Sequence, residues 1–233
     1  MRVNLVFHDI AENHKELKNK YSLHIGYFLD LIKELDQIVT KPQADTRFTL
    51  YFDDGYQSLY EQVLPLRRQI KFPITAAIIT DKINMNAYIT LDQLKDIYSK
   101  KIQIASHGVS HAALAVYKNN KLQNTPKGGV YENSPFGQGE PLTEKEIKYQ
   151  FIESKKRLQL LINTEVTEFV LPYGLYNPTV VDLFKSENIY SFLSTCDIGA
   201  DNGQMLRPRF LISNDHPVKE TISNISTLTN HEI

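Results

Sequence analysis

The sequence predicts an α/β fold, either a barrel or an open sheet of parallel strands that alternate with helices. Three observations predict it. Short apolar segments rich in β-branched and aromatic residues alternate with longer segments of helical periodicity. No repeat, low-complexity tract or linker divides the 233 residues, so we expect a single domain over residues 1–233. Ionisable residues directly follow several of the apolar segments, as they do where parallel strands end at a binding site.

The strands are predicted from short apolar segments of the kind that is buried on both faces of a parallel sheet. In chain order these segments are residues 3–7, 48–52, 74–80, 102–106, 168–171, 189–194 and 206–213. The expected sheet therefore has seven strands.

The helices are predicted from apolar periodicity and from capping residues. Thr143 and Glu146 form a capping box at the start of one helix, and Asn177 followed by Pro178 starts another. Pro65 is expected to bend or delay a third helix. The predicted helices span residues 25–39, 57–70, 90–100, 143–162 and 177–188.

Residues 115–142 interrupt this alternation. The segment is rich in Gly, Pro and Asn and has no periodic pattern. Loops of this length within a compact domain are usually functional or disordered. We expect a surface insertion near the site, which could act as a lid.

Composition excludes several classes of protein. The net charge of −1 argues against a broad nucleic-acid interface and against a polybasic membrane patch. Cys196 is the single cysteine, so neither an internal disulfide nor a cysteine-based zinc site is expected, and we expect it to be a small core residue. No segment approaches a membrane span, and the N-terminal apolar run of about five residues is too short for a secretory signal. The expected location is cytoplasmic, unless a leader was removed.

The candidate chemistry lies after the predicted strands. His107 and His111 in "SHGVSH" are four residues apart, which places two imidazoles close enough to share a cation. Asp53 and Asp54 follow another strand, and either carboxylate would complete a site of two histidines and one carboxylate. Facial-triad iron oxygenases use the same ligand types, in a different order along the chain. The alternative is a purely structural role, in which the two histidines are helix caps or surface residues and bind no cation.

Three short motifs resemble those of the NodB-homology polysaccharide deacetylases, carbohydrate esterase family four. They are "YFDDG" (51–55), "HGVSH" (107–111) and, in part, "VLPYG" (170–174). The resemblance extends over roughly residues 45–213. It implies a distorted (β/α)7 barrel that hydrolyses an N-acetyl or N-formyl group from an amino sugar.

The resemblance also implies roles for individual residues. Asp54, His107 and His111 would bind a divalent metal, for which zinc is expected. Asp53 would be the general base that takes a proton from the attacking water. The backbone N–H of Tyr173, between Pro172 and Gly174, would stabilise the oxyanion.

Two departures from the family pattern require substitutes. Val170 stands where many members have the arginine that steadies the base, and Arg209, or else Arg207, is expected to replace it. The sequence also resembles the circularly permuted branch, typified by the poly-N-acetylglucosamine deacetylases. In that branch the strand bearing the acid histidine is N-terminal, so His8 is favoured over His216 as the general acid.

The chain has no tryptophan to form an aromatic wall around the substrate. Tyr173, Tyr176 and Phe136 are candidates to stack on a sugar ring, although each could equally be a packing residue. The expected partner is an N-acylated sugar in an oligosaccharide or polysaccharide, or one linked to a nucleotide or a lipid. The alternative is a catalytically inactive carbohydrate-binding or scaffold protein that retains the fold, an alternative motivated by Val170.

Overall fold

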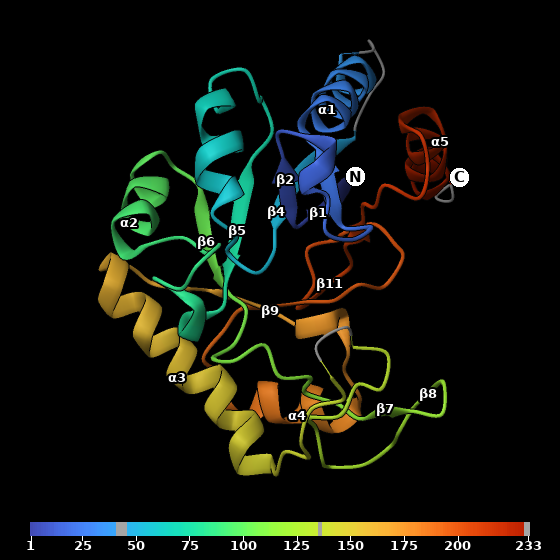
Figure 1. Cartoon of the computed structure of the whole chain (residues 1–233). Helices are drawn as coiled ribbons and strands as arrows, with labels where there is room; N and C mark the ends of the chain where they lie inside the picture. Colours follow the sequence, from blue (N-terminus) through green and yellow to red (C-terminus); the bar gives the residue numbers. More distant parts are fainter. Residues whose placement is uncertain (41–45, 135–136, 231–233) are drawn as a thin grey trace.

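The protein is built on one curled sheet of eight parallel strands with helices on its outside (Figure 1). The computed structural model describes residues 1–40, 46–134 and 137–230, with the side chains of 229 and 230 left out. The strand order is β11-β10-β9-β6-β5-β4-β1-β12. The strands are β1 (Arg2–Phe7), β4 (Arg47–Phe52), β5 (Ile74–Ile78), β6 (Gln103–Ser106), β9 (Glu168–Val170), β10 (Phe192–Ser194), β11 (Leu206–Arg207) and β12 (Phe210–Leu211). The prediction of a distorted (β/α) barrel is confirmed.

The last predicted strand, 206–213, was wrong in one respect, because it forms two short strands instead of one. β11 pairs with β10 and β12 pairs with β1, so this segment contacts both edges of the curled sheet. Pro208 lies between the two strands and has no N–H to donate to a ladder, which favours an interruption there. The first and last strands are therefore neighbours, as the permuted arrangement requires.

Apolar side chains fill both faces of the sheet. A small inner cluster of Val6, Tyr51, Ala77, Ala105 and Val170 fills the concave side. The larger cluster lies between the sheet and the helices. Burial on both faces explains why the strands have continuous apolar sequences in place of an alternating pattern.

Four of the predicted helices form close to the expected bounds. They are α1 (Ile25–Val39), α2 (Leu91–Ser99), α3 (Glu144–Ile162) and α4 (Pro178–Glu187). The Thr143 capping box and the Asn177 cap are both present. The helix predicted at 57–70 is wrong: around Pro65 the chain forms only a π-helical turn (Leu59–Val63) and a 3₁₀ turn (Leu64–Leu66). A fifth helix, α5 (Val218–Asn230), was not predicted because its sequence is rich in Ser, Thr and Asn, which are weak helix formers.

Two excursions from the sheet approach its carboxyl end. The first follows β1 and contains the short strands β2 (Asp9–Ala11) and β3 (Ser22–His24), joined by a loop. The second is the predicted insertion 115–142, whose described residues are irregular apart from the hairpin strands β7 (Tyr117–Lys118) and β8 (Lys121–Leu122). Within the described ranges, no helix combines the length and the apolar character needed to cross a membrane.

Candidate active site

A cavity of about 580 Å³ lies at the carboxyl ends of the strands. The described residues that line it include most of the predicted site: His8, Asp53, Asp54, His107, His111, Tyr173 and Gly174. They come from the ends of β1, β4, β6 and β9, which are separated in sequence but lie within one run of five neighbouring strands, with β5 between β4 and β6. The sheet therefore brings together the residues that sequence motifs had indicated one by one.

Asp54, His107 and His111 form a three-residue cluster at the base of this cavity. Asp54 Oδ1 lies 3.3 Å from Nε2 of His107 and 3.3 Å from Nε2 of His111. One ligand atom from each residue lies within 4.8 Å of the others. Asp54 Oδ1 is buried and has no hydrogen-bond partner among the described residues. A buried oxygen that faces two imidazole nitrogens fits a divalent transition metal, since carboxylate and imidazole are its usual ligands.

The backbone and neighbouring groups orient these side chains. His107 Nδ1 lies 2.8 Å from the carbonyl oxygen of Val170, which turns Nε2 towards Asp54. Asp54 (φ 72°) and His111 (φ 64°) both occupy the left-handed region, which is uncommon for residues other than glycine. Burial lowers the pKa of His111 to about 4, which keeps its imidazole in the neutral form that binds metals.

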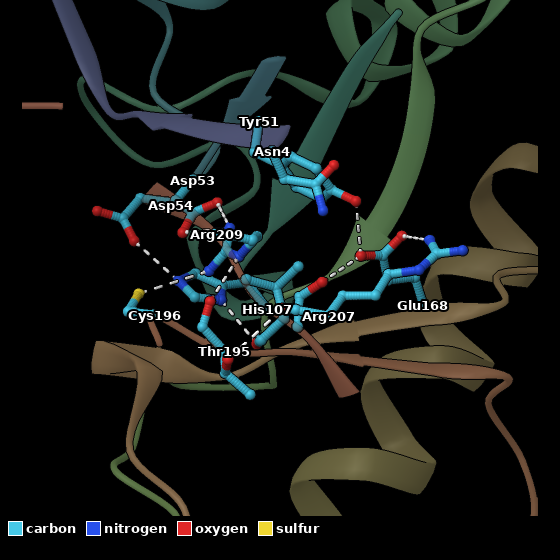
Figure 2. Close-up of polar contacts among 12 residues, drawn as sticks. Asn4, Tyr51, Asp53, Asp54, His107, Glu168, Thr195, Cys196, Arg207 and Arg209 are labelled. Carbon is cyan, nitrogen blue, oxygen red and sulfur yellow. Dashed lines mark hydrogen bonds and ion pairs between the residues drawn. The ribbon is translucent and has the colours of Figure 1, made fainter. Parts of the chain in front are cut away.

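Asp53 lies beside the cluster and pairs with Arg209 (Figure 2). Arg209 Nη1 donates to both carboxylate oxygens of Asp53, at 2.8 and 3.0 Å, and Arg209 Nε donates to the carbonyl of Thr195 at 3.1 Å. Burial raises the pKa of Asp53, but the Arg209 guanidinium, together with His107 and His8, outweighs this effect and holds the pKa below its ordinary value. Asp53 is therefore ionised at neutral pH.

Arg207, the alternative partner for Asp53, pairs instead with Glu168 at 3.0 Å. Glu168 is fully buried and also accepts hydrogen bonds from Tyr51 Oη, at 2.9 Å, and from Ser194 Oγ. The ring of Tyr51 lies 5.1 Å from the Arg209 guanidinium carbon. The sequence did not indicate Glu168, because a carboxylate inside a short strand has no local motif, and it indicated Tyr51 only as part of "YFDDG", without a role of its own.

The two candidate acid histidines occupy different environments. His8 lines the cavity, and its ring lies 5.3 Å from that of Tyr21. Its Nδ1 is buried and has no hydrogen-bond partner within the described part of the chain. His216 lies on an exposed turn, where its Nδ1 lies 2.8 Å from Glu220. The structure thus brings His8, and not His216, to the cavity.

The third motif forms the short 3₁₀ turn Pro172–Gly174. Tyr173 has a left-handed backbone (φ 59°), and its ring lies 4.5 Å from that of His111. Gly174 is required at this point, because a Cβ there would lie 2.5 Å from Cβ of Cys196. Cys196 is only half-buried and lines the cavity, which corrects the expectation of a core position.

Several residues that line the cavity were missed. Lys18, Lys20 and Tyr21 come from the loop between β2 and β3, and Tyr131 comes from the insertion. The rings of Tyr131 and Tyr173 lie 4.7 Å apart. The insertion thus lies at the cavity, as predicted for a segment near the site. The only available signal was the density of Tyr and Lys in these loops, which is too common on protein surfaces to identify a site.

The other two candidates for stacking on a sugar ring are Tyr176 and Phe136. Tyr176 lines a separate surface groove, and its hydroxyl donates to Asp197 at 2.6 Å. Phe136 lies outside the described residues. Among the three aromatic candidates, the structure places Tyr173 at the cavity.

Comparisons with known sequences match this geometry. A family model described as polysaccharide deacetylase matches residues 40–191. Poly-beta-1,6-N-acetyl-D-glucosamine N-deacetylase of Escherichia coli K12 is 24% identical over 209 residues, covering 81% of this chain and 31% of that protein. The protein of the same name from Staphylococcus aureus MSSA476 is 25% identical over 225 residues, covering 86% of this chain and 71% of that protein. The chain thus spans about a third of the length of the first relative and most of the second.

Solved structures share the fold. The Streptococcus pyogenes deacetylase PplD, in complex with acetate, superposes with a TM-score of 0.71 at 18% identity, over 95% of this chain and 96% of that one. IcaB from Ammonifex degensii gives a TM-score of 0.71 at 15% identity, over 95% of each chain. The family model covers more than half of the sequence, and its motif residues meet in the cavity. The chain therefore belongs to the polysaccharide deacetylase family.

Proposed function

We propose that this protein removes an N-acetyl or N-formyl group from an amino sugar in a glycan by metal-dependent hydrolysis. One observation carries the proposal: the Asp54, His107 and His111 cluster lines the same cavity as Asp53, the carboxylate that Arg209 holds from behind. A metal site beside a separate ionised carboxylate is the arrangement that amide hydrolysis by water needs. The names of the relatives, which describe N-deacetylases, support the same reaction.

Asp54, His107 and His111 would hold the metal, for which zinc is the expected ion. When bound, such an ion polarises the amide carbonyl and makes an attacking water more acidic. His107 is oriented for this role by its contact with Val170, and the burial of His111 keeps that imidazole neutral.

Asp53 accepts the proton of the attacking water in this scheme. Arg209 occupies both carboxylate oxygens from one side and keeps the carboxylate ionised, while each oxygen retains a further lone pair. Asp53 lines the cavity, so a water molecule can reach it. Arg209 thereby supplies the positive charge that Val170 cannot.

His8 and Tyr173 complete the reaction. As the amide C–N bond breaks, His8 donates a proton to the leaving nitrogen, and the products are a free amine and acetate (or formate). His8 is suited to this because it lines the cavity and an imidazole nitrogen can carry a proton and release it. The backbone N–H of Tyr173 belongs to the first turn of a 3₁₀ helix, which does not use it internally, so it is available to the oxyanion.

Tyrosines around the cavity favour a sugar as the substrate. Tyr21, Tyr131 and Tyr173 present rings to the cavity, and aromatic faces pack well against the apolar face of a pyranose ring. We propose a poly-N-acetylglucosamine-type polymer or oligomer, following the names of the relatives, with a nucleotide- or lipid-linked sugar as the alternative. The insertion that carries Tyr131 would close over the bound sugar.

An inactive binding protein is the second candidate, because Val170 replaces a family arginine. Arg209 weakens that argument, since it makes the contact with Asp53 that the missing arginine would make. A measurement of turnover distinguishes the deacetylase from the inactive binding protein, because only the deacetylase would release acetate or formate.

The test combines metal content with product formation. Elemental analysis of the purified protein should show about one divalent metal per chain, and N-acetylated glucosamine oligomers should release acetate. His107→Ala should lose both properties, while His216→Ala, which changes a histidine outside the cavity, should keep both. Metal binding without acetate release from polymers, nucleotide sugars and lipid-linked sugars would favour the binding protein.

A further inference from the structure

Gln150 of α3 contacts the turn that carries the two cluster histidines, and the reaction described above does not use it. Its Oε1 accepts hydrogen bonds from the backbone N–H groups of Val109, at 2.9 Å, and Ser110, at 3.1 Å. Its Nε2 donates to Ser110 Oγ at 3.2 Å. The side chain is buried. All of its hydrogen-bonding contacts with this turn thus fall between His107 and His111.

The opposite side of the same turn is also held. The carbonyl oxygens of Gly108 and Val109 accept hydrogen bonds from the N–H groups of Thr80, at 3.1 Å, and Asp81, at 2.9 Å. A Cβ on Gly108 would lie 3.2 Å from Oε1 of Gln150, in a left-handed backbone (φ +81°). Only glycine combines this close approach with this backbone conformation at no cost.

Loss of the Gln150 oxygen would leave the buried N–H of Val109 and the partly buried N–H of Ser110 without this acceptor. Unpaired buried donors are costly, so the turn would move to find new partners. His111 follows this turn and has a left-handed backbone (φ 64°), which persists only where the surroundings enforce it. Its imidazole would then leave the position 3.3 Å from Asp54 Oδ1.

We propose that Gln150 is a positioning residue that sets the spacing of the His107 and His111 imidazoles and thereby the affinity of the metal site. The inference rests on the proposed function, because it assumes that the cluster binds a metal. Gln150 lies three residues after Ile147 and four before Ser154, on the buried face of α3. A polar residue on this face has a specific partner, and here the partner is the turn between the two histidines.

The experiment measures zinc affinity of the metal-free protein by competition with a chromophoric chelator. Gln150→Leu, which has no acceptor, should bind zinc about 10–100-fold more weakly, the loss typical of residues that orient metal ligands. Gln150→Glu keeps an acceptor oxygen whether ionised or protonated, and its affinity should stay within about threefold of the original.

Gln159→Leu is the matched control. Gln159 is on the same helix and also accepts a backbone hydrogen bond, from Val166 at 3.1 Å, but none of its hydrogen bonds involves the histidine turn. This variant should keep the original zinc affinity even if its melting temperature falls. Gln150→Met gives the same comparison as Gln150→Leu if the leucine variant does not fold, because methionine fills similar space and is only a weak acceptor.

The outcomes separate the inference from the proposed function. Unchanged zinc affinity in Gln150→Leu and Gln150→Met, with normal binding by the unsubstituted protein, would overturn the inference alone. An equal loss in Gln150→Leu and Gln150→Glu would also overturn it, because the acceptor oxygen would then not matter. Failure of the unsubstituted protein to bind any divalent metal would overturn the proposed function together with the inference.

Discussion

Two buried carboxylate–arginine pairs lie in the same curled sheet, yet they have different surroundings. Asp53 pairs with Arg209 and lines the cavity, whereas Glu168 pairs with Arg207 and is fully enclosed (Figure 2). Asp53 directly follows the carboxyl end of β4, while Glu168 is the first residue of the short strand β9, and the strand register places the two at a similar level of the sheet. Access separates them: Asp53 lines the cavity at the carboxyl ends of the strands, where barrels of this kind carry their chemistry, and Glu168 has no exposed surface.

The pairs also differ in how completely the carboxylate is used. Glu168 receives hydrogen bonds from Tyr51, Ser194 and Arg207. Among the described residues, the side-chain hydrogen bonds to Asp53 come from Arg209 alone. The same ion-pair chemistry therefore holds one carboxylate at the cavity and joins strands inside the sheet with the other, and access to the cavity makes the difference.

Neutralising each carboxylate should give the largest difference between the two pairs. Asp53→Asn should lower kcat about 10²–10⁴-fold, because the general base is lost, while zinc binding changes little. Glu168→Gln should leave kcat of the folded protein within a few-fold and lower the free energy of unfolding, since Arg207 loses a buried anion. Acetate-release kinetics, zinc titration and urea unfolding measure these effects. Full activity in Asp53→Asn would contradict the assignment of the base.

Replacing each arginine in turn should give similar losses of stability but different pH profiles of turnover. Arg209→Met and Arg207→Met should each lower the free energy of unfolding by about 3–5 kcal/mol, because each leaves a buried carboxylate unpaired. Only Arg209→Met should change the pH profile of turnover. Arg209 holds the pKa of Asp53 below 3.8 against the effect of burial, so without it the acid limb should move to higher pH.

The sign of the stability effect follows from the same pKa. A carboxylate whose pKa is lowered by folding contributes stability above its unfolded pKa, and this contribution is lost as the pH falls through the lowered value. The deficit of Arg209→Met relative to the original protein should therefore be largest near neutral pH and shrink in acid. An acid limb that moves equally in Arg207→Met would contradict the distinction between the two pairs.

Replacing His8 and His216 separately tests which histidine protonates the leaving nitrogen. Of the two, only His8 lines the cavity together with Asp53. His8→Gln should lower kcat about 10²-fold, because the leaving amine loses its proton donor, while zinc binding is retained. His216→Gln should leave kcat unchanged, since His216 is exposed and pairs with Glu220. Steady-state kinetics of the two variants give the answer, and a larger loss in His216→Gln would reverse the assignment.

Tyr51 links the two pairs and should show the smallest effect. Its hydroxyl donates to Glu168 while its ring lies against Arg209. Tyr51→Phe removes the hydroxyl and keeps the ring, so the free energy of unfolding should fall by about 1 kcal/mol and kcat should stay within about twofold. Thermal unfolding together with acetate release would check this, and a large loss of kcat would show that the Glu168 pair also supports catalysis.

The sequence by itself determined most of the strands and helices and the residues of the histidine–carboxylate cluster. Short apolar segments and capping boxes are local signals, because a strand buried on both faces and a helix end each need particular neighbours in the chain. The spacing of His107 and His111, with Asp53 and Asp54 after another strand, was sufficient for the cluster because parallel strands align their carboxyl ends.

Only the tertiary structure decided which residues, far from the cluster in the sequence, lie beside it in the fold. Arg207 and Arg209 are equivalent in sequence, and the interruption of the last strand around Pro208 is what leaves one facing Asp53 and the other facing Glu168. His8 reaches the cavity because β1 pairs with β12 at the closure of the sheet. Gln150 contacts the histidine turn because α3 packs on β6. These are contacts between residues far apart in the chain, and the packing that selects one partner over another leaves no local pattern in the sequence.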